Sequence, residues 1–558
     1  MAEVILPGTY VTVRDEALIT AGRVATGNIG IVGTASKGPL DEVKILGSFT
    51  EAREIFGDSD EWIDGNSNEL TLIRALSQIY QNGGRTVYAV RTASSSAAKA
   101  AYQTRSDGDA ELTKLEALSP GTWGNEITIE ITDAEEPALV SETLPGDASA
   151  LNRSNVVEGS GINSISVKQT STGLTLQYEI VYNSAPDNAQ PQVGIDTSTG
   201  ALTFTTLEGF APVAADTINA RYQVPAVNSK KVQLSYEGSS ESYTVTDASH
   251  LAELVNAASA LVSTDEANED AFYNQLPANT DGKKLFGTGL DGHDAGGNGE
   301  DAGADDYKGS LAKLENEIVN IVVLAGQAAS DVQMSMNLIG HINTTAEIRR
   351  ERIAVIGSNG TDDINAMAGH NLNSERVIYV VPGIKTGVRQ TLPGAYTAAA
   401  VAGLLSSLPV QASPTNKVLN IPGLSSEFSA PQLEKLVQNR VLAVEKREGF
   451  RVVKGITTST NSAWHQITTR RIVDFAIYGV RSGCNPYIGK LNNSRVRGAL
   501  KATLDAFLTR MVEDEALITY ELEVSATRAQ EIAGEAIVNM TIRPTFSIDF
   551  IKVTMYLE

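Results

Sequence analysis

The strongest constraint on the fold comes from short, almost continuous runs of Val and Ile that alternate with helical segments. Three such runs lie in the second half of the chain, at residues 318–326, 352–357 and 376–381. Strands that are apolar on both faces belong to parallel or mixed sheets covered by helices, because a strand with one face in solvent alternates apolar and polar residues. The pattern therefore predicts an α/β core.

The same architecture is predicted near the start of the chain. Residues 28–33 read as a buried strand, and a short helix is expected between Ser48 and Gly57. A longer helix ends at Gly83 and Gly84, and the strand RTVYAVR follows it. Ser is favoured before a helix and Gly after one, so these bounds have a physical basis. The β-α-α-β order indicates the first part of the core.

The segment between residues 94 and 280 has a different character. Ser, Thr, Asn, Gly and Asp dominate it, and short alternating strands such as EITIEIT and KVQLSY occur among them. Residues 101–310 carry 10 Lys and Arg against 32 Asp and Glu, a net charge of −22, whereas the whole chain carries −23. This composition predicts a β-rich, acidic, solvent-facing insertion.

A third unit follows, and it is basic: residues 431–510 carry 14 Lys and Arg against 5 Asp and Glu. We expect helices at residues 431–447, 470–481 and 494–515 and strands after them, which together predict an α+β domain. The predicted units are residues 1–26 (strand arm and linker), 27–93 (core, first part), 94–280 (outer insertion), 281–430 (core, second part) and 431–558 (C-terminal inner domain with a terminal strand arm).

Both ends of the chain read as strands without a local partner. One run alternates from Val4 to Val13, and the other from Phe546 to Leu557. Unpaired backbone groups along a strand invite pairing with another chain, so we expect these arms to form sheets between copies. The side chains expected to contact a neighbouring copy are Val4, Leu6, Tyr10, Val11, Val13, Phe546, Ile548, Phe550 and Val553.

Composition argues against several classes of protein. The start, MAEVILPG, has no basic region or long apolar segment, and no other run is suited to span a bilayer, so we expect neither export nor stable membrane insertion. A single cysteine, Cys484, excludes an intrachain disulfide framework and suits assembly in a reducing cytoplasm.

Two glycine-rich stretches resemble ligand-binding loops. GNIGIVG, at residues 27–33, has the wrong spacing for a nucleotide loop and no Lys-Ser or Lys-Thr after it, so a structural strand is favoured. DGHDAGGNGEDAGADD, at residues 291–306, places carboxylates among glycines as calcium sites do, but it has only one Gly-Gly-x-Gly-x-Asp unit. A solvated acidic loop is favoured there. The five histidines are scattered and match no zinc motif, so no metal is expected.

The helix in PGAYTAAAVAGLL, residues 393–405, resembles the serine segment of subtilisins. The alignment puts Ala395 where the nucleophilic serine would lie. Alanine has no oxygen to attack a carbonyl, and no strong Asp and His motifs precede it, so we expect a subtilisin-like core without the chemistry. We predict no catalytic residue and no cofactor.

Basic side chains gather on two predicted helices of the C-terminal unit. They form either a solvated face or a docking surface, and a protein partner is favoured because the helices lack exposed aromatic residues of the kind that stack on bases. Direct contact with nucleic acid is therefore not expected. The residues are Arg470, Arg471, Arg481, Arg495, Arg497 and Lys501.

Several stretches, taken in order, resemble the tail sheath proteins of contractile-tailed phages and related contractile injection systems. They are ILPGTYV, IGIVGTASKGPLDEV, YQNGGRTVYAVR, SPGTWGN at residues 119–125, SPTNKVLN at residues 413–420 and WHQITTRRIVDFAIYGVR. The resemblance covers most of the chain and is weakest between residues 130 and 280. Thr415 stands where the family usually has alanine, a small departure.

The resemblance implies a structural subunit and not an enzyme. Such subunits stack as hexameric rings around an inner tail tube, and contraction drives the tube through the target envelope to deliver DNA or effectors. It implies that the terminal strands join neighbouring subunits, with residues 17–26 as a hinge, and that the basic residues face the tube. Further implied partners are the baseplate and tail terminator proteins, and the implied location is the virion tail, assembled in the host cytoplasm.

Three alternatives stay open. A sheath of a non-viral injection system or of a tailocin would lack neighbouring genes for a capsid and a terminase. A subtilisin-like hydrolase would be labelled on a serine by a fluorophosphonate. A surface adhesin that binds calcium through residues 291–306 would melt at a temperature that depends on calcium.

Overall fold

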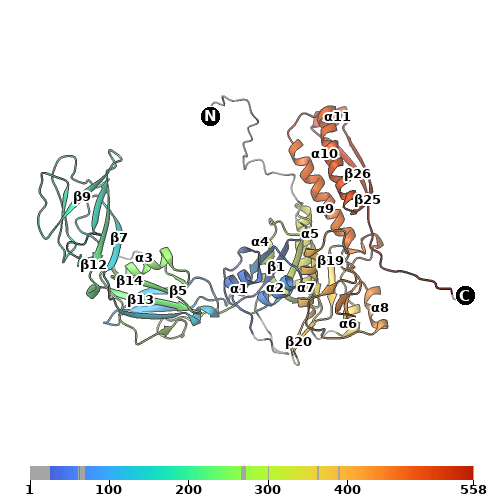
Figure 1. Cartoon of the computed structure of the whole chain (residues 1–558), viewed down its shortest axis with the longest axis horizontal. Coiled ribbons are helices and arrows are strands. Elements are labelled where there is room, and N and C mark those ends of the chain that lie inside the picture. The colour runs from blue at the N-terminus through green and yellow to red at the C-terminus, as the bar shows by residue number, and fades with distance from the viewer. Residues whose placement is uncertain are drawn as a thin grey trace.

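A computed structural model of the chain describes residues 26–60, 62, 70–265, 272–299, 301–360, 363–387 and 390–556. An α/β core lies in the middle of the molecule, a long insertion extends from one side of it, and a helical C-terminal unit stands on the other side (Figure 1). The N-terminal arm, including Val4, Leu6, Tyr10, Val11 and Val13, lies outside the described residues.

The core is built on a mixed sheet of nine strands, to which both predicted core parts contribute. Strands β3, β1, β17, β18, β19 and β23 run parallel, and the strands at the two ends pair antiparallel. The first core part joins the second where Ile29 pairs with Ile321. In spatial order the strands are β2 (Val43–Leu46), β3 (Val87–Arg91), β1 (Ile29–Gly33), β17 (Ile321–Ala328), β18 (Ile353–Gly357), β19 (Val377–Val381), β23 (Leu442–Lys446), β24 (Phe450–Val452) and β22 (Val418–Leu419).

Helices cover both faces of this sheet, which explains why its central strands are apolar throughout. Ile29 and Ile31 belong to one hydrophobic cluster and Val32 to another, because successive strand residues point to opposite faces. One face packs against α1 (Phe49–Phe56), α2 (Leu72–Gln81) and α7 (Gly394–Ser407). The other packs against α4 (Ala304–Lys313), α5 (Val332–Glu347), α6 (Ile364–Ala368) and α8 (Ala430–Gln438).

The predicted helix ends in the first core part are confirmed. Ser48 caps α1 by accepting a hydrogen bond from the Glu51 amide, and Gly57 follows the helix with a φ of 78°. Helix α7 is buried from Gly394 to Leu405, as expected for a helix of small residues. A Cβ on Gly403 would lie 2.3 Å from the carbonyl oxygen of Ile79, so α2 and α7 approach closely only because this residue is glycine.

One predicted helix is wrong. Residues 431–447 form α8 and then strand β23, because Arg440 takes a positive φ of 67° that ends the helix. The buried run that follows it then pairs with β19. The core sheet therefore continues through β24, and the domain boundary set at residue 431 moves to the segment between β24 and helix α9 (Ile467–Cys484).

The insertion consists of two parts, each with its own hydrophobic cluster. The part near the core holds α3 (Ala248–Ala258) and two small sheets, formed by β14 (Ser239–Val245), β13 (Lys230–Tyr236), β6 (Thr128–Asp133) and β16 (Lys284–Leu285), and by β15 (Val262–Ser263), β5 (Glu111–Ala117) and β4 (Ala101–Arg105). The distal part is a sheet of β11 (Leu202–Phe204), β10 (Gln192–Ile195), β9 (Thr175–Tyr182), β8 (Ser164–Lys168), β12 (Thr217–Val224) and β7 (Ala138–Pro145).

The insertion ends later than predicted. Strand β16 and the buried Phe286 belong to its inner part, and Ala98 pairs with Gly297 where the chain enters and leaves. The boundary predicted at residue 280 is therefore too early, because residues 281–299 also pack on the insertion. Residues 291–299, which the sequence marks as an acidic glycine-rich loop, form part of this connection.

A buried arginine fastens the insertion to the core. Arg91 is fully buried and donates hydrogen bonds to the carbonyl oxygens of Gly38, Pro120 and Asn298. Gly121, within the SPGTWGN stretch, packs so close to Ser36 that a Cβ there would lie 1.9 Å from its carbonyl oxygen. The stretch is therefore a structural joint.

Candidate assembly site

The C-terminal unit has a small core of its own. Helix α9 packs against α10 (Ser494–Glu513), and α10 in turn supports a hairpin of β25 (Leu517–Ser525) and β26 (Ile537–Pro544). Gly479 lies against the ring of Phe507, where a Cβ would approach to 1.9 Å, so the two helices pack closely. Helix α11 (Arg528–Ala533) connects the two strands at the far end of the unit. Figure 1 shows the unit standing away from the core on the base of α9.

The hairpin β25–β26 is an incomplete sheet. It has two strands, and within the described residues neither outer edge has a partner. Tyr520 and Leu522 pack towards α10, while Ile518, at an irregularity in the pairing of the two strands, is 52% exposed. An isolated two-stranded sheet is marginally stable in water, and its free edges can accept further strands.

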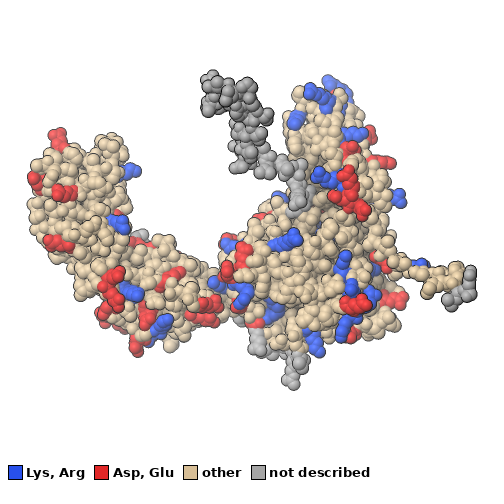
Figure 2. Space-filling view, viewed as in Figure 1, with Lys and Arg blue, Asp and Glu red and all other residues tan. Residues whose placement is uncertain are grey.

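The C-terminal tail leaves the body as an extended segment without a strand partner. Residues 545–556 form no β-ladder within the described chain, so the predicted strand is present as extended backbone only. Figures 1 and 2 show the tail projecting from the body, with mostly uncharged atoms on its surface. The four predicted tail residues are all exposed: Phe546 (55%), Ile548 (80%), Phe550 (77%) and Val553 (76%).

The apolar alternation of the tail changes phase in its middle. Apolar side chains occupy even positions up to Phe550 and odd positions from Ile551 to Met555. Successive strand residues point to opposite faces, so a single straight strand would expose its apolar side chains on different faces before and after this point. The tail is therefore divided into a first half, residues 545–550, and a second half, residues 551–556.

The first half of the tail is fastened to the body. The Ser547 amide donates to Oε1 of Gln466, and Nε2 of Gln466 donates to Oδ2 of Asp549, each at 3.3 Å. Lys454 Nζ lies 3.6 Å from Asp549 Oδ2 and 5.2 Å from the centre of the Phe550 ring. Beyond Phe550 all side chains up to Tyr556 are exposed.

Two of the predicted basic residues do not form an outer surface. Arg470 and Arg471 are 4% and 5% exposed, which contradicts a role in direct docking. Arg470 pairs with Glu375 and with Asp474 one turn along α9. Asp474 also accepts one hydrogen bond from each terminal nitrogen of Arg376, so this network joins α9 to the core.

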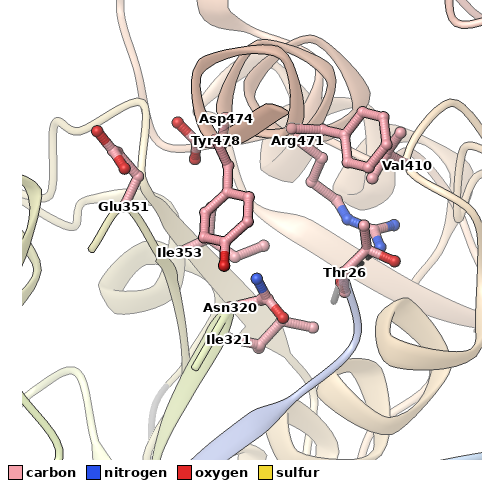
Figure 3. A pocket seen from close by; sticks show the side chains of 10 residues that line it. Thr26, Asn320, Ile321, Glu351, Ile353, Val410, Arg471, Asp474 and Tyr478 are labelled. Carbon is pink, nitrogen blue, oxygen red and sulfur yellow. Dashed lines mark hydrogen bonds between the residues drawn. The ribbon is translucent and has the colours of Figure 1, made fainter. Parts of the chain in front are cut away.

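Arg471 has no carboxylate partner among the described residues. It donates to the carbonyl oxygens of Thr26, Leu408 and Pro409, and its burial lowers the pKa of the guanidinium. Figure 3 shows its side chain reaching towards Thr26 at the edge of a small cavity, about 50 Å³, on whose other side Tyr478 and Asn320 lie. Thr26 is the last residue of the predicted N-terminal arm and linker, so this segment meets the core beside Arg471 of α9.

The other four basic residues differ from one another. Arg481 forms a bidentate pair with Glu351, and Arg497 pairs with Glu531 on α11. Arg495 and Lys501 are exposed and have no ion pair within the described chain. Figure 2 shows Lys and Arg atoms gathered over the far end of the C-terminal unit. Among the predicted basic residues, only Arg495 and Lys501 are therefore both exposed and without an ion pair in the described chain.

Charge spacing along the helices held a signal for the Arg470 pair, but it does not separate paired from unpaired residues, because Asp505 also follows Lys501 by four residues and the two form no ion pair in the described chain. Asp474 follows Arg470 by four residues, and opposite charges at this spacing pair on a helix. The carboxylates of Glu351 and Glu375 come from distant loops, so their pairing with α9 had no local signal.

The remaining motifs have structural explanations. GNIGIVG spans β1, whose residues are all buried. Ala395 is buried in the first turn of α7 and offers no nucleophile. Within the described chain, no cluster of three or more His, Cys, Asp or Glu side chains is placed to hold a metal ion. Among these residues, none of the helices combines the length and apolar character needed to cross a bilayer.

Comparisons with known proteins agree in the family that they indicate. The sequence model of the phage tail sheath protein central domain matches residues 300–458, and that of the phage tail sheath C-terminal domain matches residues 459–558. The tail sheath protein of Bacillus phage SP01 is 26% identical over 230 residues, which cover 38% of this chain and 39% of that protein. The match thus spans well under half of that relative.

Two solved structures share the fold over almost the whole chain. The sheath tail protein of Desulfitobacterium hafniense has a TM-score of 0.56 at 14% identity, covering 96% of this chain and 100% of its own. The sheath tail protein of Listeria innocua has a TM-score of 0.58 at 14% identity, covering 94% and 92%. At this level of identity the likeness concerns the fold alone.

Proposed function

We propose that this chain, which belongs to the phage tail sheath family, polymerises as stacked hexameric rings around an inner tail tube and contracts to drive that tube through a target envelope. The family is structural, so the chain is a tail component of a phage or of a contractile injection system and not an enzyme. Delivery of DNA or effectors, baseplate and tail terminator partners, and assembly in the host cytoplasm belong to the same proposal.

The observation that carries the proposal is the presence of an exposed apolar tail and an incomplete sheet in the same chain. Tail residues 546–556 expose their apolar side chains to solvent, and the hairpin β25–β26 has two free edges within the described chain. Fully burying one Ile, Phe or Met side chain contributes about 1.5 to 3 kcal/mol, so a tail seated on a neighbour gains several such contributions. We infer that the tail of one subunit extends the hairpin sheet of the next, and that residues 1–26 make a second link of this kind.

The charge distribution fits an inner and an outer side. Arg495 and Lys501 carry unpaired charge on the C-terminal unit, and we propose that they face an acidic surface of the tube. The acidic insertion lies away from that unit and would face the exterior (Figure 2). Contacts between exposed charges are screened by salt and individually weak, which suits a surface that must be released on contraction.

The core also suits a passive role. We propose that it is a relative of the subtilisin fold without a catalytic function, since Ala395 replaces the serine in the alignment. A non-viral injection system or a tailocin remains the alternative assignment, and the genes next to this one decide it.

A competing peptide tests the carrying observation. Residues 545–558 supplied as a free peptide should occupy the hairpin edge and prevent the purified subunit from forming tubes, as seen by negative-stain electron microscopy. The control is the same peptide with Ile551, Val553 and Met555 changed to Ser, which retains the backbone donors but loses most apolar contact. Normal tubes in the presence of excess unmodified peptide would contradict the proposal.

A further inference from the structure

The two arms begin at one short stretch of helix α9. Gln466, the residue that precedes the first turn, contacts Ser547 and Asp549 of the tail. Arg471, five residues later, contacts Thr26 at the start of the described chain. At a rise of 1.5 Å per residue the two anchoring residues lie roughly 7.5 Å apart along the helix axis.

This stretch of helix is fixed firmly in the core. Residues from Ile467 to Ile472 are all buried, and the Ile467 amide donates to the carbonyl oxygen of Gly455. The network of Arg376, Arg470 and Asp474 holds the next turn against the core. A buried charge is costly unless hydrogen bonds and opposite charges compensate it, so these ion pairs hold α9 in one position against the core.

The described residues where each arm meets the body make a few polar contacts. On the N-terminal side, the Asn28 amide donates to Asn320 Oδ1 at 3.1 Å, and its Nδ2 donates to the Ile318 carbonyl oxygen at 2.7 Å. On the C-terminal side, the contacts stop at Phe550, where the apolar alternation of the tail changes phase. The change of phase and the end of the anchoring contacts coincide at Phe550. They divide the tail into an anchored root, residues 545–550, and a free part, residues 551–556.

We infer that the first two turns of α9 form a rigid bracket that holds the roots of both arms at a fixed separation. Gln466 and Arg471 are the positioning residues of this bracket. The inference rests on the proposed function in one respect, that the arms link subunits. During contraction, the separation between Thr26 and Asp549 within a subunit then stays constant while the subunits move relative to one another, and a pull on one arm passes through α9 to the other.

The first test frees the tail root while it leaves the buried Arg470 and Arg471 in place. The variants Gln466→Ala and Asp549→Ala remove the contact, Asp549→Asn keeps an oxygen acceptor for Gln466, and Asp107→Ala, at an exposed loop of the insertion, is the control. In the isolated subunit, amide hydrogen exchange at Ser547 should become about fivefold faster in Gln466→Ala, because the loss of one hydrogen bond is worth roughly 1 kcal/mol. An unchanged exchange rate would show that the root is not anchored and would overturn the inference.

The second readout is assembly. With the tail sequence intact and the melting temperature unchanged, Gln466→Ala and Asp549→Ala should form shorter and fewer tubes, and Asp549→Asn should restore them. Normal tube formation by Gln466→Ala, despite faster exchange at Ser547, would overturn the bracket. Failure of the unmodified protein to form tubes would contradict the proposed function instead, and the exchange measurement on the isolated subunit would still decide the anchoring.

The third readout is the root separation itself. Electron cryomicroscopy of the extended and contracted tubes should give Cα distances between Thr26 and Asp549 that agree within about 1 Å, as for a rigid body. A difference several times larger would overturn the inference.

Discussion

The insertion buries most of its large apolar side chains within itself, whereas the C-terminal unit leaves many of them exposed. Both parts of the insertion close their own hydrophobic clusters, and their largest sheet has six strands. The C-terminal unit has a two-stranded sheet and a tail whose apolar side chains are exposed, up to 88% at Tyr556. The comparison teaches that the insertion is complete as a single copy, whereas the C-terminal unit has surfaces that another chain can complete.

The buried ion pairs of the two regions also differ in what they connect. In the insertion, Arg153 is 1% exposed and contacts Glu142, Asp247 and Glu253, which join the distal part to α3. In the C-terminal unit, the ion pairs of Arg376, Arg470 and Arg481 fasten α9 to the core. The buried charges of the insertion therefore hold the insertion together, and those of α9 hold the base from which the arms start.

The largest effect is expected from the free half of the tail. Changing Val553 and Met555 to Ser should raise the concentration needed for tube formation by about a hundredfold, because two buried apolar side chains contribute roughly 3 kcal/mol or more together. The melting temperature of the isolated subunit should not change, since both side chains are exposed. Lys552→Ser on the same tail is the control, and equal effects of the two changes would break the comparison.

Removal of the insertion should have the opposite result. Ala98 and Gly297 pair with each other, so residues 99–296 can be replaced by a short glycine linker without moving the ends. The shortened protein should fold and still form tubes visible by negative-stain electron microscopy, because both arms and the hairpin remain. A folded protein that forms no tubes would show that the insertion also takes part in assembly.

A change inside the insertion should weaken only the insertion. Arg153→Met leaves three carboxylates without their cation, and loss of one partner from a buried pair costs about 3 to 5 kcal/mol. Calorimetry should show a separate unfolding transition at lower temperature, while the assembly of tubes at room temperature continues. A single shifted transition for the whole chain would mean that the insertion and the core unfold together.

Acid should also destabilise the insertion. Burial, assisted by the positive charge of Arg153 and opposed by Asp247, lowers the pKa of His250 to about 4. In the unfolded chain His250 has a pKa near 6.5, so between pH 6.5 and pH 4 it binds a proton that it does not bind in the folded insertion. The stability of the insertion is therefore full above pH 6.5 and falls by roughly 3 kcal/mol as the pH falls towards 4. His250→Asn should reduce this loss in acid unfolding followed by circular dichroism; an unchanged pH profile would contradict it.

The smallest effect is expected from the exposed charges. Arg495→Glu combined with Lys501→Glu should leave the melting temperature unchanged and weaken assembly on a preformed tube, more strongly at low salt than at high salt. Arg528→Glu, another exposed arginine near the far end of the unit, is the comparison variant. If tube-templated assembly is unaffected at every salt concentration, these two residues do not face the tube.

The sequence predicted the core well because its signals are local. The apolar runs that became β1, β17, β18 and β19, and the cap residues Ser48 and Gly57, depend on periodicity and on the conformational preferences of single residues. Residues 431–447 were misread because an apolar run after Arg440 fits a helix and a buried strand equally well, and only the neighbouring β19 decides between them.

The assembly site was predictable only in part. Exposed apolar alternation in the tail is visible in the sequence, and Phe546, Ile548, Phe550 and Val553 are all exposed in the structure. The basic residues were grouped by proximity along two helices, but burial depends on carboxylates such as Glu351 and Glu375 that reach α9 from distant segments. Charge composition therefore indicated that the C-terminal unit is basic, but it did not indicate which of its basic side chains are exposed and unpaired.

The account depends on strands shared between copies, and the most direct measurement is an electron cryomicroscopy structure of the assembled tube at side-chain resolution. It should show residues 551–556 of one subunit hydrogen-bonded to the β25–β26 hairpin of a neighbour, with the exposed apolar side chains of the tail buried between them. A structure in which this tail folds back onto its own subunit, and the hairpin edges stay unpaired, would contradict the account.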